Sequence, residues 1–539
     1  MSALLDDRWA YGPGGAVQRE VHYDGRDVLC YANRPATLTE MCDNCVRDFP
    51  DRPAVVEGRR LSYAELDRDV KAIAAGLIAH DVTVGSRVAL FMTNRWQYIA
   101  CLFACARIGA ITVPLSSRLA SGELEFLLND SGATILIFEE KLADIVPDGA
   151  AVPDLKYRFS VDGTGGGAQP FADLLADALA VPATPCQEED VTVILYTSGT
   201  TGRPKGAMLT HMGIVHSSLT FARCVGLTEE DRAMVAVPLS HVTGLVGVAL
   251  SAMSVGGCAV LLRESFERRS FLTYASQERM TYSILVPTIY SLIAMTPELD
   301  DTDLSCWRIG CFGGAPMPVN TIERISEKLP QLALINAYGA TETTSPTTIM
   351  PLTVWRDHID SVGQIVPCGK VKVLGDDGSE LPPGEVGELL IAGPMVVPGY
   401  YNRPEANAKE FVDGYWRSGD LGSIDKDGFV RVFDRRKDMI NRGGFKVFSA
   451  EVEDKLNHHD PVLECAVIGK PDPVLGERVH AFIVPRHGSD IDLDELKAFC
   501  AKTMSDYKRP ESYTVLKEPL PRNNNGKIQK QTLRAMLES

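Results

Sequence analysis

Residues 197–206 read TSGTTGRPKG and directly follow the apolar run VTVILY at 191–196. A strand or helix would bury such a stretch at a high cost, because each unpaired hydroxyl or backbone amide costs about 1–3 kcal/mol. The glycines allow a close backbone approach, while the hydroxyls, the N–H groups and Lys205 supply donors and positive charge. We therefore predict a loop that wraps phosphate groups, with a nucleoside triphosphate as the ligand.

The spacing of this loop does not fit the Walker-type phosphate loop. That loop requires a lysine directly after its second glycine, at the start of a helix. Here Pro204 precedes Lys205, and Gly206 follows it. For this segment taken alone, a solvated linker rich in Gly, Ser and Thr stays an alternative.

Length and composition indicate a large globular enzyme or binding protein. A chain of 539 residues is long enough for two or more domains. Its 45% apolar and 23% charged residues are ordinary for a globular protein with a sizeable core. The net charge of −17 argues against nucleic acid or an anionic membrane as a partner, so a phosphate ligand needs a locally basic site.

The cysteines and apolar segments indicate a cytoplasmic protein without integral membrane association. The thirteen cysteines are scattered, which is typical of reduced thiols, and Cys42 and Cys45 form a CxxC without a second pair at zinc spacing. The first thirty residues lack a signal segment. The uncharged stretch 242–262 is interrupted by glycines and serines, which favours a buried helix, a glycine turn and a strand over a membrane span. Monomer and homodimer both stay open.

The order of apolar and amphipathic runs predicts an α/β fold. Apolar β-rich runs alternate with helical stretches, as in RVALFM followed by QYIACLFACARIGA, which predicts mostly parallel, helix-covered sheets. From about residue 365, short strands with Gly and Asp turns predict a small β-rich subdomain. A compact α+β pattern follows, in which SAEVEDKLNHH predicts a capped helix. We predict a large N-terminal domain over 1–434 and a small mobile α+β C-terminal domain over 435–539.

The loop at 197–206 resembles the signature loop of the acyl-adenylate-forming enzymes. This superfamily contains acyl-CoA synthetases, peptide-synthetase adenylation domains and firefly luciferase. Five further motifs stand in the family's order and extend the resemblance over nearly the whole chain. They are PLSHVTGL at 238–245, FGGAP at 312–316, NAYGATETT at 336–344, YWRSGDLG at 415–422, and the pair DRRKDMINRGGFKV at 434–447 and PLPRNNNGK at 519–527.

The resemblance implies a role for each motif. His241 would lie beside the acyl carboxylate, and Tyr338 would offer a flat face on which a purine stacks. Glu342, with Thr197, would hold the Mg²⁺ that bridges the triphosphate, since this ion prefers carboxylate and phosphate oxygens. Asp420 would hold the ribose hydroxyls. Taken alone, these residues would be read as a core histidine, a helix-capping box and a turn aspartate.

The resemblance also implies the remaining site residues. Lys205 and Lys527 would be catalytic cations together with Glu342 and His241; Lys437 would be the hinge, and Gly443 and Gly444 would line the tunnel of the acceptor thiol. The nucleotide-binding residues would be Thr197, Ser198, Gly199, Thr200, Thr201, Gly202, Lys205, Gly313, Gly314, Ala315, Pro316, Asn336, Ala337, Tyr338, Gly339, Ala340, Thr341, Asp420, Val432, Arg435 and Lys527.

The mechanism that follows has two steps. The acid's carboxylate attacks the α-phosphate of ATP to give an acyl-AMP and pyrophosphate, and a thiol then displaces AMP. Because negative charge spreads over the phosphates, positioning and electrostatics from Mg²⁺, Lys205 and Lys527 must stabilise the first step. In this family the C-terminal domain rotates between the steps, which would bring in Lys527 first and the Gly443–Gly444 loop second. Asp434 and Asn523 depart from common family residues but touch no matched catalytic position.

We expect a free-standing acyl-CoA ligase that uses ATP, Mg²⁺ and CoA. The alternatives are an enzyme that loads a carrier-protein phosphopantetheine, a luciferase-like oxidase, which would need a lysine where Asn441 stands, and a non-catalytic nucleotide-binding regulator. The segments expected to line the acid pocket, 242–250, 284–290 and 338–346, offer no cation. They favour a fatty, alicyclic or aromatic monocarboxylic acid, unless Arg308 folds into the pocket.

Overall fold

The structure is a computed structural model that describes residues 9, 16–23, 25–176, 181–197, 204–263, 266–315, 317–486, 489–522 and 528–538. Contacts group the chain into two compact units, Met1–Val371 with Ile391–Trp416, and Lys372–Leu390 with Arg417–Ser539. The predicted division at 434/435 and the hinge at Lys437 are not tested by this grouping and stay predictions. The predicted α/β fold class is confirmed by the elements described below.

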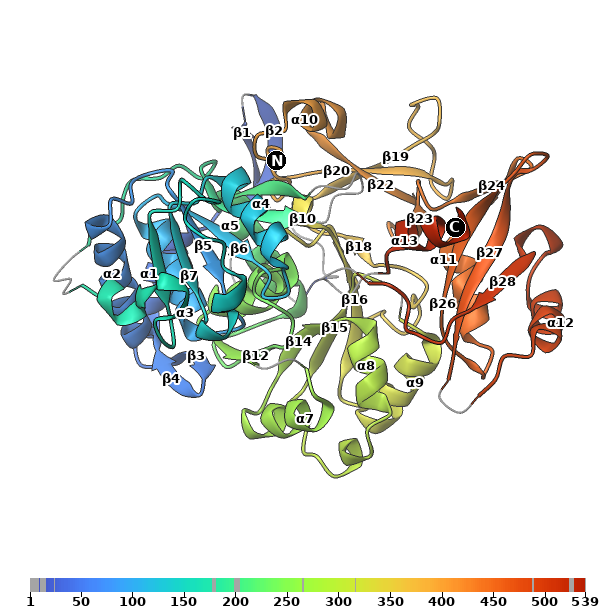
Figure 1. Ribbon diagram of the computed structural model, residues 1–539, viewed down its shortest axis with the longest axis horizontal. Coiled ribbons are helices and arrows are strands. Elements are labelled where there is room, and N and C mark those ends of the chain that lie inside the picture. Colours follow the sequence, from blue (N-terminus) through green and yellow to red (C-terminus); the bar gives the residue numbers. More distant parts are fainter. Residues whose placement is uncertain are drawn as a thin grey trace. The chain divides into compact units, whose positions relative to one another are not determined.

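A largely parallel sheet of seven described strands forms one layer of the first unit (Figure 1). Its order is β11–β10–β6–β5–β7–β8–β9, and only the β10–β11 pair is antiparallel. The strands are β5 (Arg87–Phe91), β6 (Ile111–Leu115), β7 (Ile135–Phe138), β8 (Tyr157–Ser160), β9 (Gln169–Pro170), β10 (Val191–Thr197) and β11 (Lys205–Thr210). All four residues of β7 are buried, because helices cover both faces of such a sheet and the strand then reads as one apolar run.

A second sheet, of nine described strands, carries the FGGAP and NAYGATETT motifs. Its order is β18–β17–β16–β15–β14–β12–β13–β3–β4, parallel from β16 to β3. The strands are β3 (Pro53–Glu57), β4 (Arg59–Ser62), β12 (Arg232–Val235), β13 (Cys258–Leu261), β14 (Tyr282–Leu285), β15 (Ile309–Phe312), β16 (Ala333–Tyr338), β17 (Thr348–Ile349) and β18 (Gln364–Ile365). The carboxyl ends of β15 and β16 therefore lie side by side.

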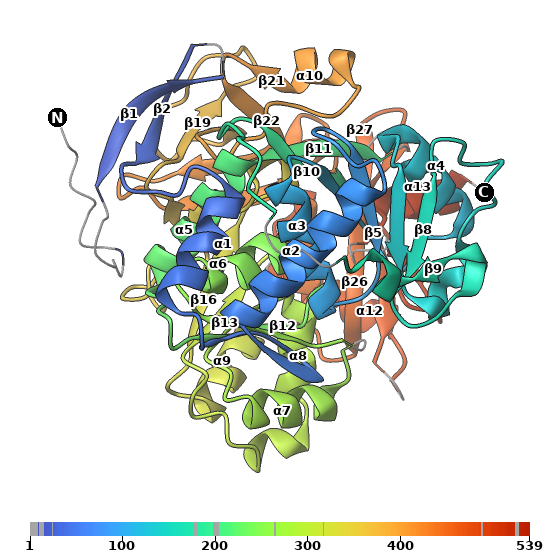
Figure 2. The ribbon, with the colours of Figure 1, turned by 90° about the vertical axis from the view of Figure 1, so that its left-hand side faces the viewer.

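Helices cover these sheets. Figure 2 shows α1, α2 and α3 packed together, and α2 begins with a capping box between Ser62 and Glu65. Apolar residues of α4 form one core with Phe91 and Phe138 of the seven-stranded sheet. The helices of this unit are α1 (Leu38–Asp48), α2 (Tyr63–Ala79), α3 (Trp96–Arg107), α4 (Ser121–Ser131), α5 (His211–Val225), α6 (Ser251–Met253), α7 (Arg268–Gln277), α8 (Pro287–Ala294), α9 (Val319–Lys328) and α10 (Pro404–Glu410).

The uncharged stretch 242–262 folds as predicted. It forms a buried π-helix, η4 (Thr243–Leu250), then α6, a turn and β13. Gly256 in the turn has a positive φ of 82°, which favours glycine. None of the described helices combines the length and the apolar character needed to cross a lipid bilayer.

The second unit contains the described C-terminal sheet, with the order β25–β24–β27–β26 and β28 beside β27. Its helices and strands enclose a core that includes Val452, Val467 and Leu496. The elements are β24 (Ile440–Arg442), β25 (Phe445–Val447), β26 (Val462–Asp472), β27 (Gly476–Pro485), β28 (Ser512–Val515), α11 (Ser449–Asn457), α12 (Leu493–Thr503) and α13 (Lys530–Glu538). The short strands predicted from residue 365 onward are β19 (Lys370–Leu374), β20 (Gly387–Ala392), β21 (Phe411–Val412), β22 (Tyr415–Ile424) and β23 (Val430–Arg435).

The predicted capped helix at SAEVEDKLNHH is α11, but its cap comes from outside the motif. The residue before the helix, Phe448, offers no side-chain acceptor. Instead the carboxylate of Asp434 accepts hydrogen bonds from the backbone N–H of Ser449, at 2.5 Å, and from its hydroxyl, at 2.7 Å. A negative charge at a helix N-terminus is favourable because the first N–H groups lack partners. Asp434, a departure from the family pattern, thus has a structural role.

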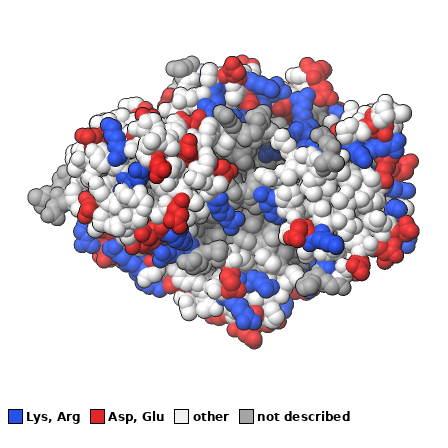
Figure 3. Space-filling view, in the orientation of Figure 1, with Lys and Arg blue, Asp and Glu red and all other residues white. Residues whose placement is uncertain are grey.

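Charges of both signs lie interspersed on the face drawn in Figure 3. Many charged side chains of the described residues are paired, as in the exposed pair Arg19 and Asp27, 2.8 Å apart, and the buried pair Arg95 and Glu139, 3.1 Å apart. The net charge of −17 is therefore spread over the chain in mixed-sign surroundings.

Candidate active site

Two glycine-rich segments meet at the carboxyl ends of β15 and β16. Phe312 and Asn336 are register partners, so Gly313 and Ala337 follow side by side. A Cβ on Gly313 would lie 2.3 Å from the carbonyl oxygen of Ala337, and only glycine permits this approach. Gly314 has a positive φ of 79°. Ligands of open α/β sheets bind beyond the carboxyl ends of parallel strands, so this is where a base would be expected.

The other predicted nucleotide-binding residues of these two segments lie close to this point. Tyr338 ends β16 and is half-buried. A Cβ on Gly339 would lie 3.2 Å from Pro346 Cα, so the loop folds back closely over the strand end. The half-buried residues Asn336, Ala337, Ala340 and Thr341, and the exposed Ala315, lie on these same two segments.

The predicted phosphate loop connects β10 to β11. Thr197 and Lys205 are register partners at the loop end of this hairpin, and the Thr197 hydroxyl lies 3.4 Å from the Lys205 carbonyl oxygen. The structure therefore places both described ends of the loop in adjacent strands. Ser198, Gly199, Thr200, Thr201 and Gly202 lie outside the described residues, as do Pro316 and Lys527.

Glu342 and Lys205 are brought together by two residues that the sequence did not single out, Tyr400 and Glu410. The phenol oxygen of Tyr400 lies 2.9 Å from Glu342 Oε1 and 2.8 Å from Glu410 Oε2. Lys205 Nζ donates to Glu410 Oε1 at 2.7 Å and lies 4.1 Å from the centre of the Tyr400 ring. Burial raises the pKa of the Tyr400 phenol, and the two carboxylates raise it further, so the phenol stays protonated. We call these four residues the Tyr400 network.

The surroundings of Glu342 are compatible with its predicted role as a magnesium ligand. The residue is buried, in the short helix η6 (Thr341–Thr343), and its Oε1 accepts from Tyr400. Its Oε2 makes no hydrogen bond to a described residue, so one carboxylate oxygen remains for a hard cation. Thr197, the other predicted ligand, is the register partner of Lys205.

A group of buried hydroxyls lies between α5 and the loop after η6. A Cβ on Gly213 would lie 3.0 Å from Thr344 Oγ1, and Ser217 follows one turn further along the same face of α5. The hydroxyls of Ser217, Thr344 and Thr347 are buried and have no hydrogen-bond partner among the described residues. The half-buried His241 precedes η4, which packs against α5.

Asp420 and Arg435 lie in the second unit and are register partners on β22 and β23. Their side chains form an ion pair, with Arg435 Nε 2.6 Å from Asp420 Oδ1. The half-buried Val432, on β23, pairs with Gly422. The structure thus joins the two predicted ribose-contacting residues directly.

The Gly443–Gly444 pair forms the two-residue turn between β24 and β25, since Arg442 and Phe445 are register partners. Both glycines have positive φ, 58° and 90°, as this kind of hairpin turn requires. Both are exposed. Lys437 is exposed as well, and its carbonyl accepts from Arg534 at 3.3 Å.

Comparison with known proteins identifies the family. Residues 42–401 match the AMP-binding enzyme family, and residues 451–527 match the AMP-binding enzyme C-terminal domain. The chain belongs to the AMP-binding enzyme family. It is 39% identical over 477 residues to a feruloyl-CoA synthase of Amycolatopsis sp, covering 88% of this chain and 94% of that protein. It is 32% identical over 479 residues to the long-chain-fatty-acid–CoA ligase FadD13 of Mycobacterium tuberculosis, covering 88% and 93%.

A solved structure of this family supports the cofactors. O-succinylbenzoate coenzyme A synthetase (MenE) from Bacillus subtilis, in complex with ATP and magnesium ion, superposes with a TM-score of 0.81 at 29% identity, over 93% of this chain and 99% of that one. The predicted membership in the superfamily is confirmed. The chain is an AMP-forming acyl-CoA ligase that uses ATP, Mg²⁺ and CoA, as predicted.

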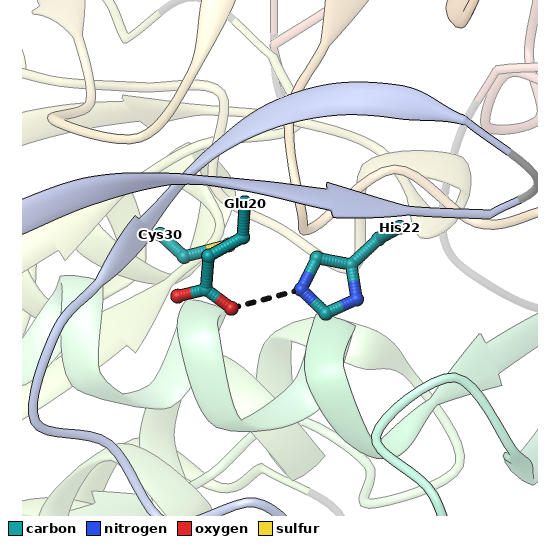
Figure 4. Close-up of side chains that lie close together, drawn as sticks. All are labelled: Glu20, His22 and Cys30. Atoms are coloured by element: carbon teal, nitrogen blue, oxygen red, sulfur yellow. Dashed lines mark hydrogen bonds and ion pairs between the residues drawn. The ribbon is translucent and has the colours of Figure 1, made fainter.

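A second polar cluster, Glu20, His22 and Cys30, lies on the β1–β2 hairpin (Val17–His22 and Arg26–Tyr31), outside these motifs (Figure 4). Both oxygens of Glu20 accept from Arg34 at 2.7 Å, and the guanidinium lowers the pKa of that carboxyl. The His22 ring nitrogens lie 3.0 Å from Glu20 and 2.9 Å from Glu189. Burial raises the pKa of the Cys30 thiol to about 12. The cluster is an ion-pair network, because its metal-ligating atoms are already engaged or protonated.

Proposed function

We propose that the acid activated by this ligase is an aromatic monocarboxylic acid that carries hydroxyl or methoxy groups, of the hydroxycinnamate class. This narrows the predicted range of fatty, alicyclic and aromatic monoacids. The observation that carries the proposal is that the buried hydroxyls of Ser217, Thr344 and Thr347 have no hydrogen-bond partner among the described residues. The 39% identity to a feruloyl-CoA synthase supports it independently.

The three buried protein hydroxyls favour this acid class over a fatty acid. A buried hydroxyl without a partner costs about 1–3 kcal/mol. An alkyl chain would leave all three unpaired, whereas a ring with oxygen substituents supplies acceptors and a donor. A site built to hydrogen-bond a substrate also rejects an analogue that lacks the group.

A second carboxylate on the acid is disfavoured. The three lining segments contain no Lys or Arg, and an unpaired buried carboxylate is expensive. Arg308, the cation that would have changed this interpretation, is engaged elsewhere. Its Nη2 lies 2.7 Å from Asp231 Oδ2 and 2.8 Å from the Gly226 carbonyl oxygen.

The site residues would then divide the work as follows. The segments at Gly313 and Tyr338 hold the adenine, and Asp420 orients the ribose. Lys205 neutralises the β- and γ-phosphates, and Lys527 is brought to the α-phosphate for adenylation. Glu342, with Thr197, would hold the Mg²⁺, whose positive charge would neutralise part of the charge on the phosphates.

The second half-reaction uses other residues. The Gly443–Gly444 turn would approach the acyl-adenylate after the C-terminal domain rotates about Lys437. Its glycines leave the turn without side chains that could obstruct the thiol. His241 would orient the acyl carboxylate in the first half-reaction and border the thiol's path in the second.

We also propose that the enzyme works in the cytoplasm. All thirteen cysteines are free thiols, and a reducing compartment keeps them so.

A panel of acids in a pyrophosphate-release assay tests the acid class. Ferulate should give a kcat/KM about tenfold or more above that of cinnamate, which lacks the ring oxygens, and above that of dodecanoate. Thr344→Val keeps the side-chain shape and removes the hydroxyl, so it should lower activity with ferulate and spare activity with cinnamate. A preference for dodecanoate, or an equal loss with both aromatic acids, would contradict the proposal.

A further inference from the structure

Two carboxylates of the Tyr400 network, those of Glu342 and Glu410, compete for the single proton of Tyr400. A phenol has one proton, yet the Tyr400 oxygen lies within hydrogen-bond distance of carboxylates from both Glu342 and Glu410. In the free enzyme Lys205 makes up the difference, because its ammonium donates to the other oxygen of Glu410. Each carboxylate then has one donor.

The backbone fixes Tyr400 in this position. The segment around it runs antiparallel to β11, with a bridge between Tyr400 and Ala207, so the ring lies beside Lys205. Just before it, the Val397 N–H donates to the carbonyl of Glu342 at 2.9 Å. The same segment is therefore attached to the backbone of Glu342 and to the strand of Lys205.

Glu410 is positioned by the same segment. The side chain of Asn407, on α10, accepts from the Tyr400 N–H at 2.7 Å and donates to the Tyr400 carbonyl at 2.9 Å. These two hydrogen bonds hold α10 beside Tyr400, and Glu410 is the last residue of that helix. Tyr400 itself is only 1% exposed, so water is not a ready substitute for its hydroxyl.

We propose that Glu410 is an internal counterion of Lys205 that the triphosphate of ATP displaces, and that Tyr400 is the positioning residue that takes over Glu410 when Lys205 leaves it. In the free enzyme Lys205 pairs with Glu410, and Tyr400 donates to Glu342. When Lys205 turns to the phosphates, Tyr400 redirects its proton to Glu410. Glu342 is then released to the cation that accompanies ATP, so every charged group keeps a partner in both states.

This inference rests on the proposed phosphate-binding role of Lys205. AMP provides the comparison ligand, because it lacks the β- and γ-phosphates that Lys205 would contact. Binding of ATP and of AMP can both be measured by calorimetry with magnesium and without the acid substrate, so that no turnover occurs.

Glu410→Gln should tighten ATP binding about three- to tenfold, because ATP no longer has to break an ion pair. Tyr400→Phe keeps the ring and removes the proton, which costs Glu342 its donor in the free enzyme and Glu410 its donor in the ATP complex, so ATP affinity should stay within about twofold of the wild type. In the double variant no carboxylate at position 410 needs a donor in the complex, so it should bind ATP about threefold or more tightly than Glu410→Gln alone. AMP binding should stay within about twofold in all three variants, because neither residue faces the α-phosphate.

Two nearby substitutions serve as matched controls. Tyr401→Phe removes the neighbouring phenol, and Glu405→Gln removes an exposed carboxylate of the same helix, α10. Both should leave ATP binding unchanged. If Tyr400→Phe weakens ATP and AMP binding alike, or if it tightens ATP binding by the same factor with Glu and with Gln at position 410, the partner exchange is wrong.

Lys205→Ala separates this inference from the proposal on which it rests. It should weaken ATP binding and leave AMP binding unchanged. If it does so while Glu410→Gln has no effect on ATP binding and Tyr400→Phe acts equally with Glu and with Gln at position 410, only the partner exchange is overturned. If ATP binding does not respond to Lys205→Ala either, the phosphate-binding role of Lys205 is overturned as well.

Discussion

Replacing Gly313 with alanine gives a sharp test of the proposed adenine wall. The new Cβ would lie 2.3 Å from the Ala337 carbonyl oxygen, where real contacts stay above 3.0 Å. The obstacle is backbone of the adjacent strand, so the carboxyl ends of β15 and β16 must separate by roughly 0.7 Å or more. Such overpacking costs about 1–3 kcal/mol of stability.

The same displacement of the strand ends should also weaken nucleotide binding. A shift of this size at a wall that contacts the base should weaken ATP and AMP equally, about tenfold or more, because both ligands carry the adenine. Calorimetric titration of each nucleotide and a denaturant-unfolding curve measure the two effects.

Gly314→Ala is the matched control. No atom lies within 4 Å of its added Cβ, so its cost is only the positive φ of 79°, about 1 kcal/mol or slightly more. We expect it to lower stability slightly and to change AMP affinity much less than Gly313→Ala does. If Gly313→Ala binds AMP as the wild type does, or if both substitutions weaken AMP to the same extent, the close approach of the two strands does not shape the nucleotide site.

Three further predictions concern other parts of the chain. Lys527→Ala should abolish pyrophosphate release and spare thioester formation from supplied acyl-AMP; an equal loss of both would contradict the role in adenylation. Gly444→Ala, at a φ of 90°, should slow thioester formation more than adenylation, whereas Gly428→Ala, in another hairpin turn with a φ of 81°, should affect neither. Burial lowers the pKa of His211 from 6.5 to about 4, so below pH 6.5 the unfolded chain binds a proton that the folded chain does not, and stability falls. Unfolding curves at both pH values should show a loss of stability between pH 7.5 and pH 5 that is about 2 kcal/mol smaller in His211→Asn than in the wild type, and an equal loss would contradict the assignment.

The local features of the site could be predicted because each depends on neighbouring residues. The TSGTTGRPKG run indicated a donor-rich loop, and its described ends do close the β10–β11 hairpin. Gly313 of the FGGAP motif follows β15 at a point where only glycine fits, which accounts for the glycine at this position. The break in the uncharged stretch 242–262 falls at Gly256, as the glycine pair indicated.

The contacts that complete the site could not be predicted in this way. Lys205 and Glu410 are 205 residues apart in the chain, and Tyr400 and Glu342 are 58 apart. Neither GYYNRPEANAKEF nor its surroundings carries a pattern that would mark Tyr400 or Glu410 as partners of the phosphate loop. The cap of α11 could not be predicted either, because Asp434 lies 15 residues before Ser449 and belongs to a different element, β23.

The sequence by itself determined the reaction class, because adenylation needs particular residue types in a fixed order and these can be read along the chain. It also determined where the backbone must be free of a Cβ, since positive φ and close approach select glycine locally. Only the tertiary structure decided which charges share donors and which hydroxyls stay without partners. Those relations depend on strands that pair across hundreds of residues, and a hydrogen bond forms only when the fold brings its two atoms within about 3 Å.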